Sequence, residues 1–481
     1  MARWEPVIGL EVHVQLATRS KLFCGCEVTF ADPPNTRVCP VCLGLPGALP
    51  VLNARAVDLA ILSALALGCT VHPQSVFARK NYFYPDLPKG YQITQHDRPL
   101  ATGGALEWTG AGGRRRVRIE RLHLEEDAGK SRHEGPEGVA ARTAVDFNRS
   151  GVPLAEIVTE ADLEGAAAAA DFFERLRELL VAVGATVGNM EEGHLRCDAN
   201  VSLRAARSSP LGTPVEVKNL NSFRYLEKAL EHEIERQAAI LDAGGRVEHE
   251  TRLWDLETGR TVAMRSKEEA HDYRFFREPD LPPLAVAAER VAALRDGLPE
   301  LPEARRARLV ASFGLPEAAA RQIGGDPPTA AYFEAAVRAG VPPRQAANWI
   351  TGEIARLLKD TRLAIGEAQV SPRALARLVG QVEAGTISHG TAKEVLERMW
   401  RTGEDPEAIV ASQGLARIDD EDRLAAIVRE AVRANPRAVA QYRGGKALVF
   451  GFFVGQVMKA TGGKADPAIV NRLLARELDG A

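Results

Sequence analysis

The sequence lacks any long apolar run. No stretch approaches the roughly 18 to 20 uninterrupted apolar residues of a membrane-spanning helix. No apolar segment follows the N-terminal charges, as one would in a secretory signal. We therefore expect a cytoplasmic protein with no membrane partner. Aromatic residues make up only 6% of the chain, whereas Ala, Leu, Arg and Glu are abundant, so much of it should be helical.

With 481 residues the chain is too long for one compact core, and we expect two or three domains. Up to about residue 283, short β-like runs mix with turn residues; beyond that point amphipathic helices punctuated by Pro and Gly take over. We predict an α+β catalytic domain with an antiparallel or mixed β-sheet core at 1–292, an all-α helical domain at 293–407 and a small all-α tail domain at 408–481. The expected helices span 54–67, 164–183, 222–243, 303–313, 328–339, 343–358 and 372–384.

The first strand-like segment gathers polar side chains on one face. In residues 7–16 apolar residues alternate with Glu11, His13 and Gln15, so a strand would place these three side by side. A carboxylate and an imidazole would then share a surface. The same pattern also fits an ordinary amphipathic strand whose polar face is solvated.

Two further segments are rich in carboxylates. Residues 121–131 include Glu125, Glu126 and Asp127, more acids than a strand needs, and Glu156 lies in an otherwise apolar strand. An unpaired carboxylate there would be costly to bury, so we expect it to meet an arginine or a metal ion. Carboxylates from several strands could hold magnesium, which prefers oxygen ligands and keeps phosphates as further ligands. A buried ion-pair network is the alternative.

The sequence has no standard nucleotide-binding motif. Residues 127–131 end like a P-loop, but the first glycine of that motif falls on Leu124. Residues 79–92 combine aromatic, basic and amide side chains, which suits contact with adenine, sugar or phosphate and equally suits a loop packed by its own aromatics. Farther along, Asn221 or Ser222 could cap the helix that follows.

Cysteines are few, and most of the 6 are clustered. In a long chain without a signal peptide, such a cluster indicates a metal site before disulfides. Its spacing supplies four soft ligands from two short loops, as a closed structural zinc site requires, and buried free thiols are the alternative. Cys197 stands apart, and we expect it to be packing rather than a nucleophile. The expected zinc ligands, within residues 24–42, are Cys24, Cys26, Cys39 and Cys42.

The end of the chain is basic, although the formal net charge of the whole is only -3. Two glycine-lysine turns, at 443–446 and 461–465, bracket an apolar helix expected at 447–458. Their backbone amides and ammonium groups could hold phosphate, and a solvated helix face is the alternative. The candidate nucleic-acid contacts are Arg443, Lys446, Lys459 and Lys464.

In chain order these segments read GLEVHVQL, RKNYFYPD, RLHLEEDAGKS, DFNRSGVPLAEIV, EEGHLRCDANVSLR, VKNLNS and DYRFFREPD. The series resembles the B subunit of the aspartyl/glutamyl-tRNA(Asn/Gln) amidotransferases and covers most of the first half of the chain. The segment YRGGKALVFGFFVGQVMKAT and the helices before it resemble the helical and tail domains of the same family. The resemblance therefore spans the whole chain.

The resemblance implies an enzyme, a ligase that forms a carbon–nitrogen bond with glutamine as amido donor. In that family the B subunit uses ATP and magnesium to phosphorylate the side-chain carboxylate of Glu-tRNA(Gln) or Asp-tRNA(Asn), and ammonia then displaces the phosphate. Ammonia arrives through a tunnel from a glutaminase partner, the A subunit, and a small C subunit clamps the two. This sequence accordingly has no serine-lysine amidase centre. A non-discriminating aminoacyl-tRNA synthetase is a further expected partner.

The family's functional positions can be carried onto this sequence. Its zinc knuckle, present in some members, matches the four clustered cysteines, and the part that grips the outer corner of tRNA matches the tail. The resemblance implies nucleotide contacts at Tyr82, Lys130 and Asp198, with Asp198 and Glu125 as adjacent candidates for the metal site. The catalytic residues it implies are Glu11, His13, Glu126 and Glu156, which would bind magnesium, and Lys80 near the tunnel mouth.

Two other interpretations stay open from the sequence. An archaeal-type relative specific for glutamyl-tRNA(Gln) would carry a large inserted domain, and no comparable insert is visible between residues 272 and 301. A non-catalytic tRNA-binding scaffold would explain the basic tail. It would not explain Glu156 in an apolar strand, or the face shared by Glu11 and His13.

Overall fold

Two compact units make up the chain. The computed structural model describes residues 4–110, 113–132, 143–266, 273–418 and 420–479. The units are Met1–Ala304 and Arg305–Ala481. Helix α4 (Ala288–Asp296) lies in the first of these units, where Val291 and Leu294 pack against the core. The domain boundary expected at residue 292 stays a prediction. No described helix combines the length and the apolar composition needed to cross a bilayer.

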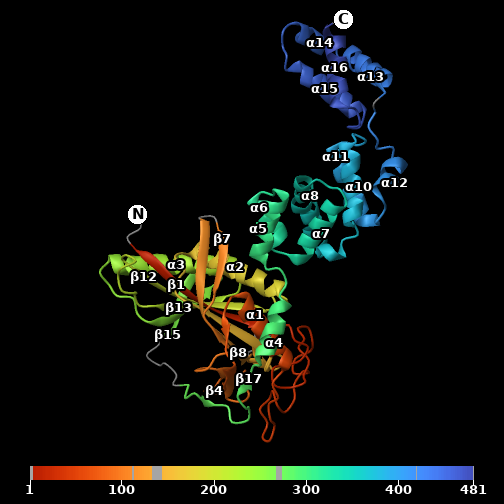
Figure 1. The fold of residues 1–481 in the computed structure, drawn as a ribbon. Helices are drawn as coiled ribbons and strands as arrows, with labels where there is room; N and C mark the ends of the chain where they lie inside the picture. Colours follow the sequence, from red (N-terminus) through yellow and green to blue (C-terminus); the bar gives the residue numbers. More distant parts are fainter. Residues whose placement is uncertain (1–3, 111–112, 133–142, 267–272, 419, 480–481) are drawn as a thin grey trace. The chain divides into compact units, whose positions relative to one another are not determined.

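A mixed β-sheet forms the core of the first unit, as the sequence predicts (Figure 1). The described residues give it 13 strands, with antiparallel pairing throughout most of it and a parallel pair at β13 and β14. Strand β1 lies between β11 and β12. The main path runs in order through β15 (Arg260–Ser266), β14 (Glu250–Asp255), β13 (Val215–Leu220), β12 (Leu195–Arg204), β1 (Glu5–Gln15), β11 (Pro153–Thr159), β8 (Gly113–Glu126), β5 (Tyr91–Gln95), β4 (Phe77–Asn81) and β16 (Phe276–Arg277).

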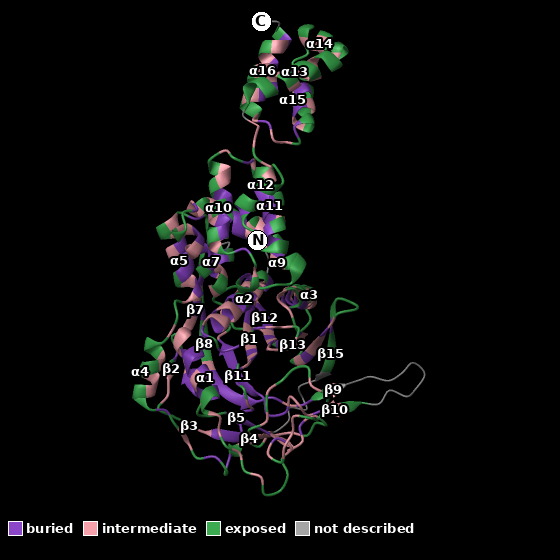
Figure 2. Cartoon of the chain, turned by 90° about the vertical axis from the view of Figure 1, so that its right-hand side faces the viewer, coloured by how far each residue is buried: buried purple, intermediate pink, exposed green. Residues whose placement is uncertain are grey.

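Strand β1 is built as its alternating pattern predicts. Leu10, Val12 and Val14 are buried in the same apolar core as Phe172 of α2 (Ala166–Ala182) and Leu226 of α3 (Phe223–Asp242). Figure 2 shows the central strands as largely buried. Because side chains alternate along a strand, the other face of β1 is left to its polar residues. The apolar face thus fixes which way the functional face points.

Three helices of the first unit begin and end close to their expected positions: α1 (Ala54–Ala66), α2 and α3. Of the two candidates for the cap of α3, Ser222 takes the role, since its Oγ accepts the backbone N–H of Tyr225 at 3.1 Å. Asn53 caps α1 in the same way through the N–H of Arg55 at 2.9 Å. Each cap satisfies a backbone donor that the first helical turn leaves free.

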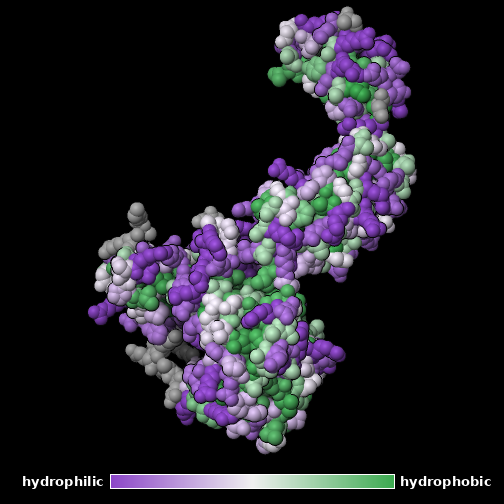
Figure 3. Space-filling view, in the orientation of Figure 1, coloured by the Kyte–Doolittle hydropathy of each residue, from purple (hydrophilic) through white to green (hydrophobic). Residues whose placement is uncertain are grey.

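Helices dominate the second unit, and their apolar sides meet in two hydrophobic clusters. One is built around Phe333 and the other around Phe453, both fully buried. These clusters favour a domain division near residue 407, which remains a proposal. The helix expected at 343–358 contains a 5-residue π-helical turn at Ile350–Ile354. Much of the visible surface of these helices is hydrophilic (Figure 3). The α-helices are α5 (Pro302–Phe313), α6 (Glu317–Gly324), α7 (Pro327–Arg338), α8 (Pro343–Trp349), α9 (Ala355–Thr361), α10 (Pro372–Glu383), α11 (His389–Thr402), α12 (Pro406–Ser412), α13 (Glu421–Ala434), α14 (Pro436–Arg443), α15 (Val449–Ala460) and α16 (Pro467–Asp479).

Candidate active site

A cavity of about 950 Å³ opens on the polar face of the sheet in the first unit. Strands β1, β8, β11, β12 and β13 supply most of its walls, so residues far apart in the sequence meet there. The residues expected from the sequence that line it are Glu11, His13, Lys80, Tyr82, Glu125, Glu156 and Asp198.

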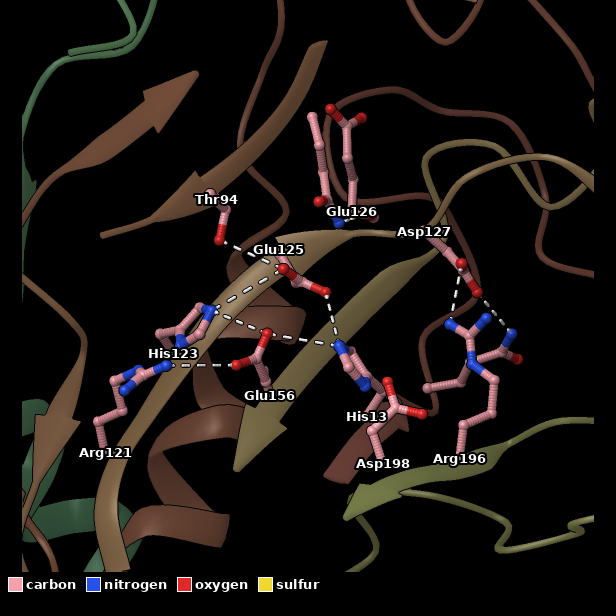
Figure 4. Close-up of polar contacts among 12 residues, drawn as sticks. His13, Thr94, Arg121, His123, Glu125, Glu126, Asp127, Glu156, Arg196 and Asp198 are labelled. Atoms are coloured by element: carbon pink, nitrogen blue, oxygen red, sulfur yellow. Dashed lines mark hydrogen bonds and ion pairs between the residues drawn. The ribbon is translucent and has the colours of Figure 1, made fainter. Parts of the chain in front are cut away.

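A cluster of one histidine and two glutamates lies on the floor of the cavity (Figure 4). His13 Nε2 is 3.5 Å from Glu125 Oε1 and 3.4 Å from Glu156 Oε2. The antiparallel register places His13 opposite Glu156 and Glu156 opposite His123, whose Nε2 lies 3.5 Å from Glu156 Oε2. Each of the three residues His13, Glu125 and Glu156 offers one ligand atom, and these atoms lie within 4.8 Å of one another. A single divalent ion could bind to all three.

The pKa values of Glu156 and His13 are shifted because the acidic and basic groups of the cluster stabilise each other's charged forms. Burial favours protonation of Glu156, but the nearby His123, His13 and Lys80 hold its pKa well below the usual range. Burial likewise opposes the charged form of His13, and its hydrogen bond to Glu156 together with the charge of Glu125 outweighs this and raises its pKa to about 9.

Glu11 lies on the acidic side of the same cavity. Burial and the neighbouring charges of Glu156, Glu216 and Asp198 raise the pKa of Glu11. Burial is the largest of these causes, and repulsion by the three neighbouring carboxylates adds to it. A cation bound near Glu11 would offset that repulsion.

Glu126 does not join this cluster. Its carboxylate accepts hydrogen bonds from Lys89 Nζ and, at 2.9 Å, from the backbone N–H of Ile93. Figure 4 shows it pointing away from His13. Consecutive side chains on a strand face opposite sides, so β8 can turn only one of its two terminal glutamates toward the cavity, and that one is Glu125. The expectation that Glu126 lies with the other acids is corrected accordingly.

Cations line the rest of the cavity. Lys80 Nζ lies 4.9 Å from the centre of the Tyr273 ring, Lys218 Nζ is 2.7 Å from Asp198 Oδ2, and Arg196 Nη2 is 2.9 Å from Asp127 Oδ1. Sequence reasoning did not single out the last two cations. For Arg196 the signal was the alternation along β12, where polar residues 196, 198 and 200 are interleaved with buried apolar ones. For Lys218 it was the alternation along β13, where Glu216 and Lys218 follow the buried Val215 and Val217.

Lys130 lies apart from the other expected nucleotide contacts. It lines a second cavity of about 510 Å³ together with Asn148, Arg149 and His194. Tyr82 and Asp198 line the larger cavity. The structure thus brings two of the three expected nucleotide contacts together and leaves Lys130 elsewhere.

The four clustered cysteines come together as their spacing predicts. Cys24, Cys26, Cys39 and Cys42 place their sulfur atoms within 4.8 Å of one another. The hydrogen bond from the Cys24 thiol, aided by the Cys39 backbone and the charge of Lys21, lowers the pKa of Cys42 to about 4. Cys197 is buried, and burial raises its pKa well above the ordinary value, so it is not poised as a nucleophile.

The basic residues of the tail differ in how free they are. Lys446, just before α15, and Lys459, in its last turn, are both exposed. Arg443 donates from Nε to the carbonyl of Leu478 at 2.9 Å, which ties α14 to α16. Lys464 is half-buried, and its carbonyl accepts the N–H of Ile418 at 2.9 Å. The first two are therefore the better placed to contact another molecule.

Comparison with known proteins gives two family matches that follow one another along the chain. Residues 6–292 match the family described as the GatB/GatE catalytic domain, and residues 331–478 match the one described as the GatB domain. Three curated relatives are named as the B subunit of an aspartyl/glutamyl-tRNA(Asn/Gln) amidotransferase. The protein of Myxococcus xanthus is 50% identical over 99% of this chain and 98% of its own length. The proteins of Thermodesulfovibrio yellowstonii and Geobacter sulfurreducens are 48% and 49% identical over 99% of this chain and 99% and 100% of theirs.

Proposed function

Because the chain belongs to the GatB/GatE family, we propose that it is the subunit of a tRNA-dependent amidotransferase that activates a mischarged tRNA. The side-chain carboxylate of Glu-tRNA(Gln) or Asp-tRNA(Asn) takes the terminal phosphoryl group of ATP. Ammonia then attacks the acyl phosphate, phosphate leaves, and the side chain becomes an amide. Phosphorylation matters because it turns a poor leaving group into a good one.

The observation that carries this proposal is the cluster of His13, Glu125 and Glu156 in a cavity with cationic walls. Its oxygen-rich donor set and the excess acid around Glu11 suit a hard divalent cation such as magnesium. Magnesium, when bound, would offset the negative charge of the transferring phosphoryl group. The family resemblance implies Glu126 as a ligand with Glu125 as an adjacent candidate, and we propose Glu125 in place of Glu126.

The residues of this chain have separate tasks in that chemistry. Lys80, which is held over Tyr273, brings an ammonium group into the cavity, where it can stabilise phosphoryl oxygens. Asp127 fixes Arg196 by a 2.9 Å ion pair, so that the guanidinium is oriented before the substrate arrives. These cations add no acid or base step. They position the anionic reactants and reduce the electrostatic repulsion between these reactants and the carboxylates of the cavity.

The cysteine cluster supports a second, structural metal site. Four sulfur donors at this spacing match a tetrahedral zinc centre, and a centre with four protein ligands leaves no position open for a substrate. We therefore assign zinc a role in holding loops together and none in the reaction.

The proposal also includes partners. The described cavity offers no serine-lysine pair for glutamine hydrolysis, so ammonia should come from a glutaminase partner, with a small third protein joining the two. Lys446 and Lys459 support the tail as the tRNA contact, because both are exposed. A non-catalytic scaffold would not need the buried acids of the cavity. The chain has no counterpart of the large insert of the archaeal-type relative, because each of the three alignments covers 99% of this chain.

The deciding experiment incubates the assembled complex with labelled ATP and Glu-tRNA(Gln) and no ammonia donor. We expect ATP hydrolysis that depends on the tRNA, and an acyl phosphate that hydroxylamine traps. Glu156→Gln should abolish both, whereas the matched change Glu160→Gln, just beyond the end of β11, should leave them intact. ATP hydrolysis that does not depend on tRNA, or a fully active Glu156→Gln complex, would contradict the proposal.

A further inference from the structure

Lys21 is a lysine with no access to solvent. Its side chain is 0% exposed and is among the largest fully buried side chains of the protein. Burying an ammonium group is costly unless an opposite charge compensates it. Among the described residues no carboxylate pairs with it, and its partners are two carbonyl groups and one sulfur atom.

The three partners of Lys21 Nζ have different roles. The carbonyls of Arg37 and Phe147 accept hydrogen bonds at 2.8 and 3.3 Å, which satisfies the donors but brings no charge. The third partner, Cys42 Sγ at 3.6 Å, belongs to the cysteine cluster. Of the three partners, the sulfur of Cys42 is the one that carries a negative charge when it binds a metal ion as a thiolate.

We propose that Lys21 is the charge-balancing residue of the four-cysteine centre. Four thiolates around one divalent zinc ion leave a net charge of about -2 in a partly buried site. The ammonium of Lys21 offsets about half of that charge at contact distance from one ligand. This inference rests on the proposed zinc site and adds to it a residue outside the ligand set, without which zinc should bind more weakly.

Lys21 also connects the cysteine loops to the segment that precedes β11. Its bond to Phe147 is accompanied by a bond from Ser150 Oγ to the carbonyl of Cys42 at 3.2 Å and from the N–H of Leu22 to the carbonyl of Gly151 at 2.8 Å. The same segment contains Arg149, which donates to the backbone just beyond β8 at Ala128 and Gly129, at 3.1 and 2.6 Å. Zinc occupancy should therefore restrain a loop that borders the reaction cavity.

The test compares zinc retention by full-length variants. Lys21→Met removes the charge and the hydrogen bonds, whereas Lys21→Gln removes the charge but keeps an amide that can donate to the carbonyls. Arg37→Met is the matched control, because Arg37 is a cation in the same loops. Its side chain pairs with Glu27 at 2.9 Å and with Asp32, and not with sulfur. Zinc content is measured first, followed by competition with a chromophoric chelator.

We expect both Lys21 variants to hold zinc about 10- to 100-fold more weakly, as for other residues that support metal ligands, and the control to stay within about twofold. If Lys21→Met does not fold, the zinc affinity of Lys21→Gln tests the inference. If Lys21→Gln binds zinc as tightly as the wild type, the role of Lys21 is overturned, but the zinc site is not. A zinc-free wild type would overturn the zinc site as well.

The coupling to the loop has its own readout. Removing zinc from the wild type should accelerate amide hydrogen exchange at Leu22, whose N–H is bonded to Gly151. The exchange of Val12 in the sheet core, fully buried, should not change. Unchanged exchange at Leu22 would show that the cysteine centre and the loop are independent.

Discussion

At the scale of single residues, the proposed chemistry depends on which of two adjacent glutamates faces the cavity. Glu125 lies 3.5 Å from His13 Nε2 and accepts a hydrogen bond from Thr94 Oγ1 at 3.3 Å. Glu126 is bound to Lys89 on the other side of the strand, where both side chains are almost fully buried, at 4% and 7% exposure. We therefore propose that Glu125 serves the reaction and that Glu126 serves the stability of the fold.

The two glutamates should respond differently to the same substitution. Glu125→Gln should lower kcat for tRNA-dependent ATP hydrolysis about 100-fold or more, because the metal loses a charged ligand. Glu126→Gln should leave a buried ammonium without its partner and cost about 3 kcal/mol of stability. Steady-state hydrolysis by the assembled complex and urea unfolding of the isolated chain measure the two effects. A slow but stable Glu126→Gln and a fast Glu125→Gln would reverse the assignment.

The sequence contains part of this distinction. On β8, His123 and Glu125 alternate with Leu122 and Leu124, which are fully buried, so Glu126 falls on the leucine side. Alternation along β1 likewise suffices to group Glu11 with His13. What alternation cannot supply is the register that sets His13 opposite Glu156, because that pairing joins segments with many elements between them.

At the scale of elements, the edge of the sheet at β4 and β16 holds one catalytic candidate in place. Arg79 donates from Nε and Nη2 to the two oxygens of Glu278 at 2.7 and 2.8 Å, and its guanidinium lies 4.2 Å from the centre of the Tyr91 ring. Lys80 follows directly on β4 and faces the cavity. The fully buried Glu278 therefore fixes the strand that presents Lys80.

Removing this clamp should weaken both the fold and the reaction. Glu278→Ala should cost about 3 kcal/mol of stability, because Arg79 loses the fully buried carboxylate that accepts two of its hydrogen bonds. It should also raise KM for ATP as Lys80 becomes less well placed. Asp280→Ala is the control: it touches the same arginine at 3.1 Å but is 37% exposed, so it should change stability by less than about 1 kcal/mol. Equal effects of the two changes would contradict the role given to Glu278.

The start of α3 offers a second test at this scale. Ser222→Ala removes the side chain that accepts the N–H of Tyr225, and it should cost about 1 kcal/mol. Asn221→Ala is the comparison, because its side chain bonds to Asn219 at 2.8 Å and not to the helix. Amide hydrogen exchange in the first turn of α3 should rise in the first variant alone. A faster exchange in Asn221→Ala would mean that the cap is shared.

Helix positions were predictable because their apolar period and caps are local, and strand pairing was not, because it is decided by packing. The π-helical turn at Ile350–Ile354 shows that even within a helix the local sequence does not predict every hydrogen bond. Nothing in the local pattern of Pro343–Trp349 and the residues after it signals a change of hydrogen-bond spacing. Such turns arise where packing of the two flanking helices demands an extra residue.

At the scale of the whole molecule, the change in composition after residue 283 correctly separates a sheet-based unit from a helical one. Although it is helical, α4 packs back onto α1 of the sheet-based unit. Arg290 donates to Asp58 at 2.7 Å across that contact. The separate apolar cluster around Phe453 indicates that the tail has a core of its own, so its surface charges can be changed without disturbing the catalytic unit.

The tail's role can be tested through the salt dependence of tRNA binding. Lys446→Ala and Lys459→Ala remove exposed cations near the two ends of α15. Each should weaken tRNA binding and lower the slope of log K against log salt by about 1 if the lysine contacts a phosphate. Arg472→Ala is the control, since this exposed arginine is already paired with Glu421 and should release fewer counterions.

Binding of Glu-tRNA(Gln) to the assembled complex is measured over a salt series, with ATP hydrolysis at saturating tRNA as the second readout. Hydrolysis at saturation should be unchanged, because the tail supplies affinity and no reacting group. Slopes equal to that of the wild type in both lysine variants would place the tRNA contact on another surface, and the basic character of the tail would then be only that of a solvated helix face.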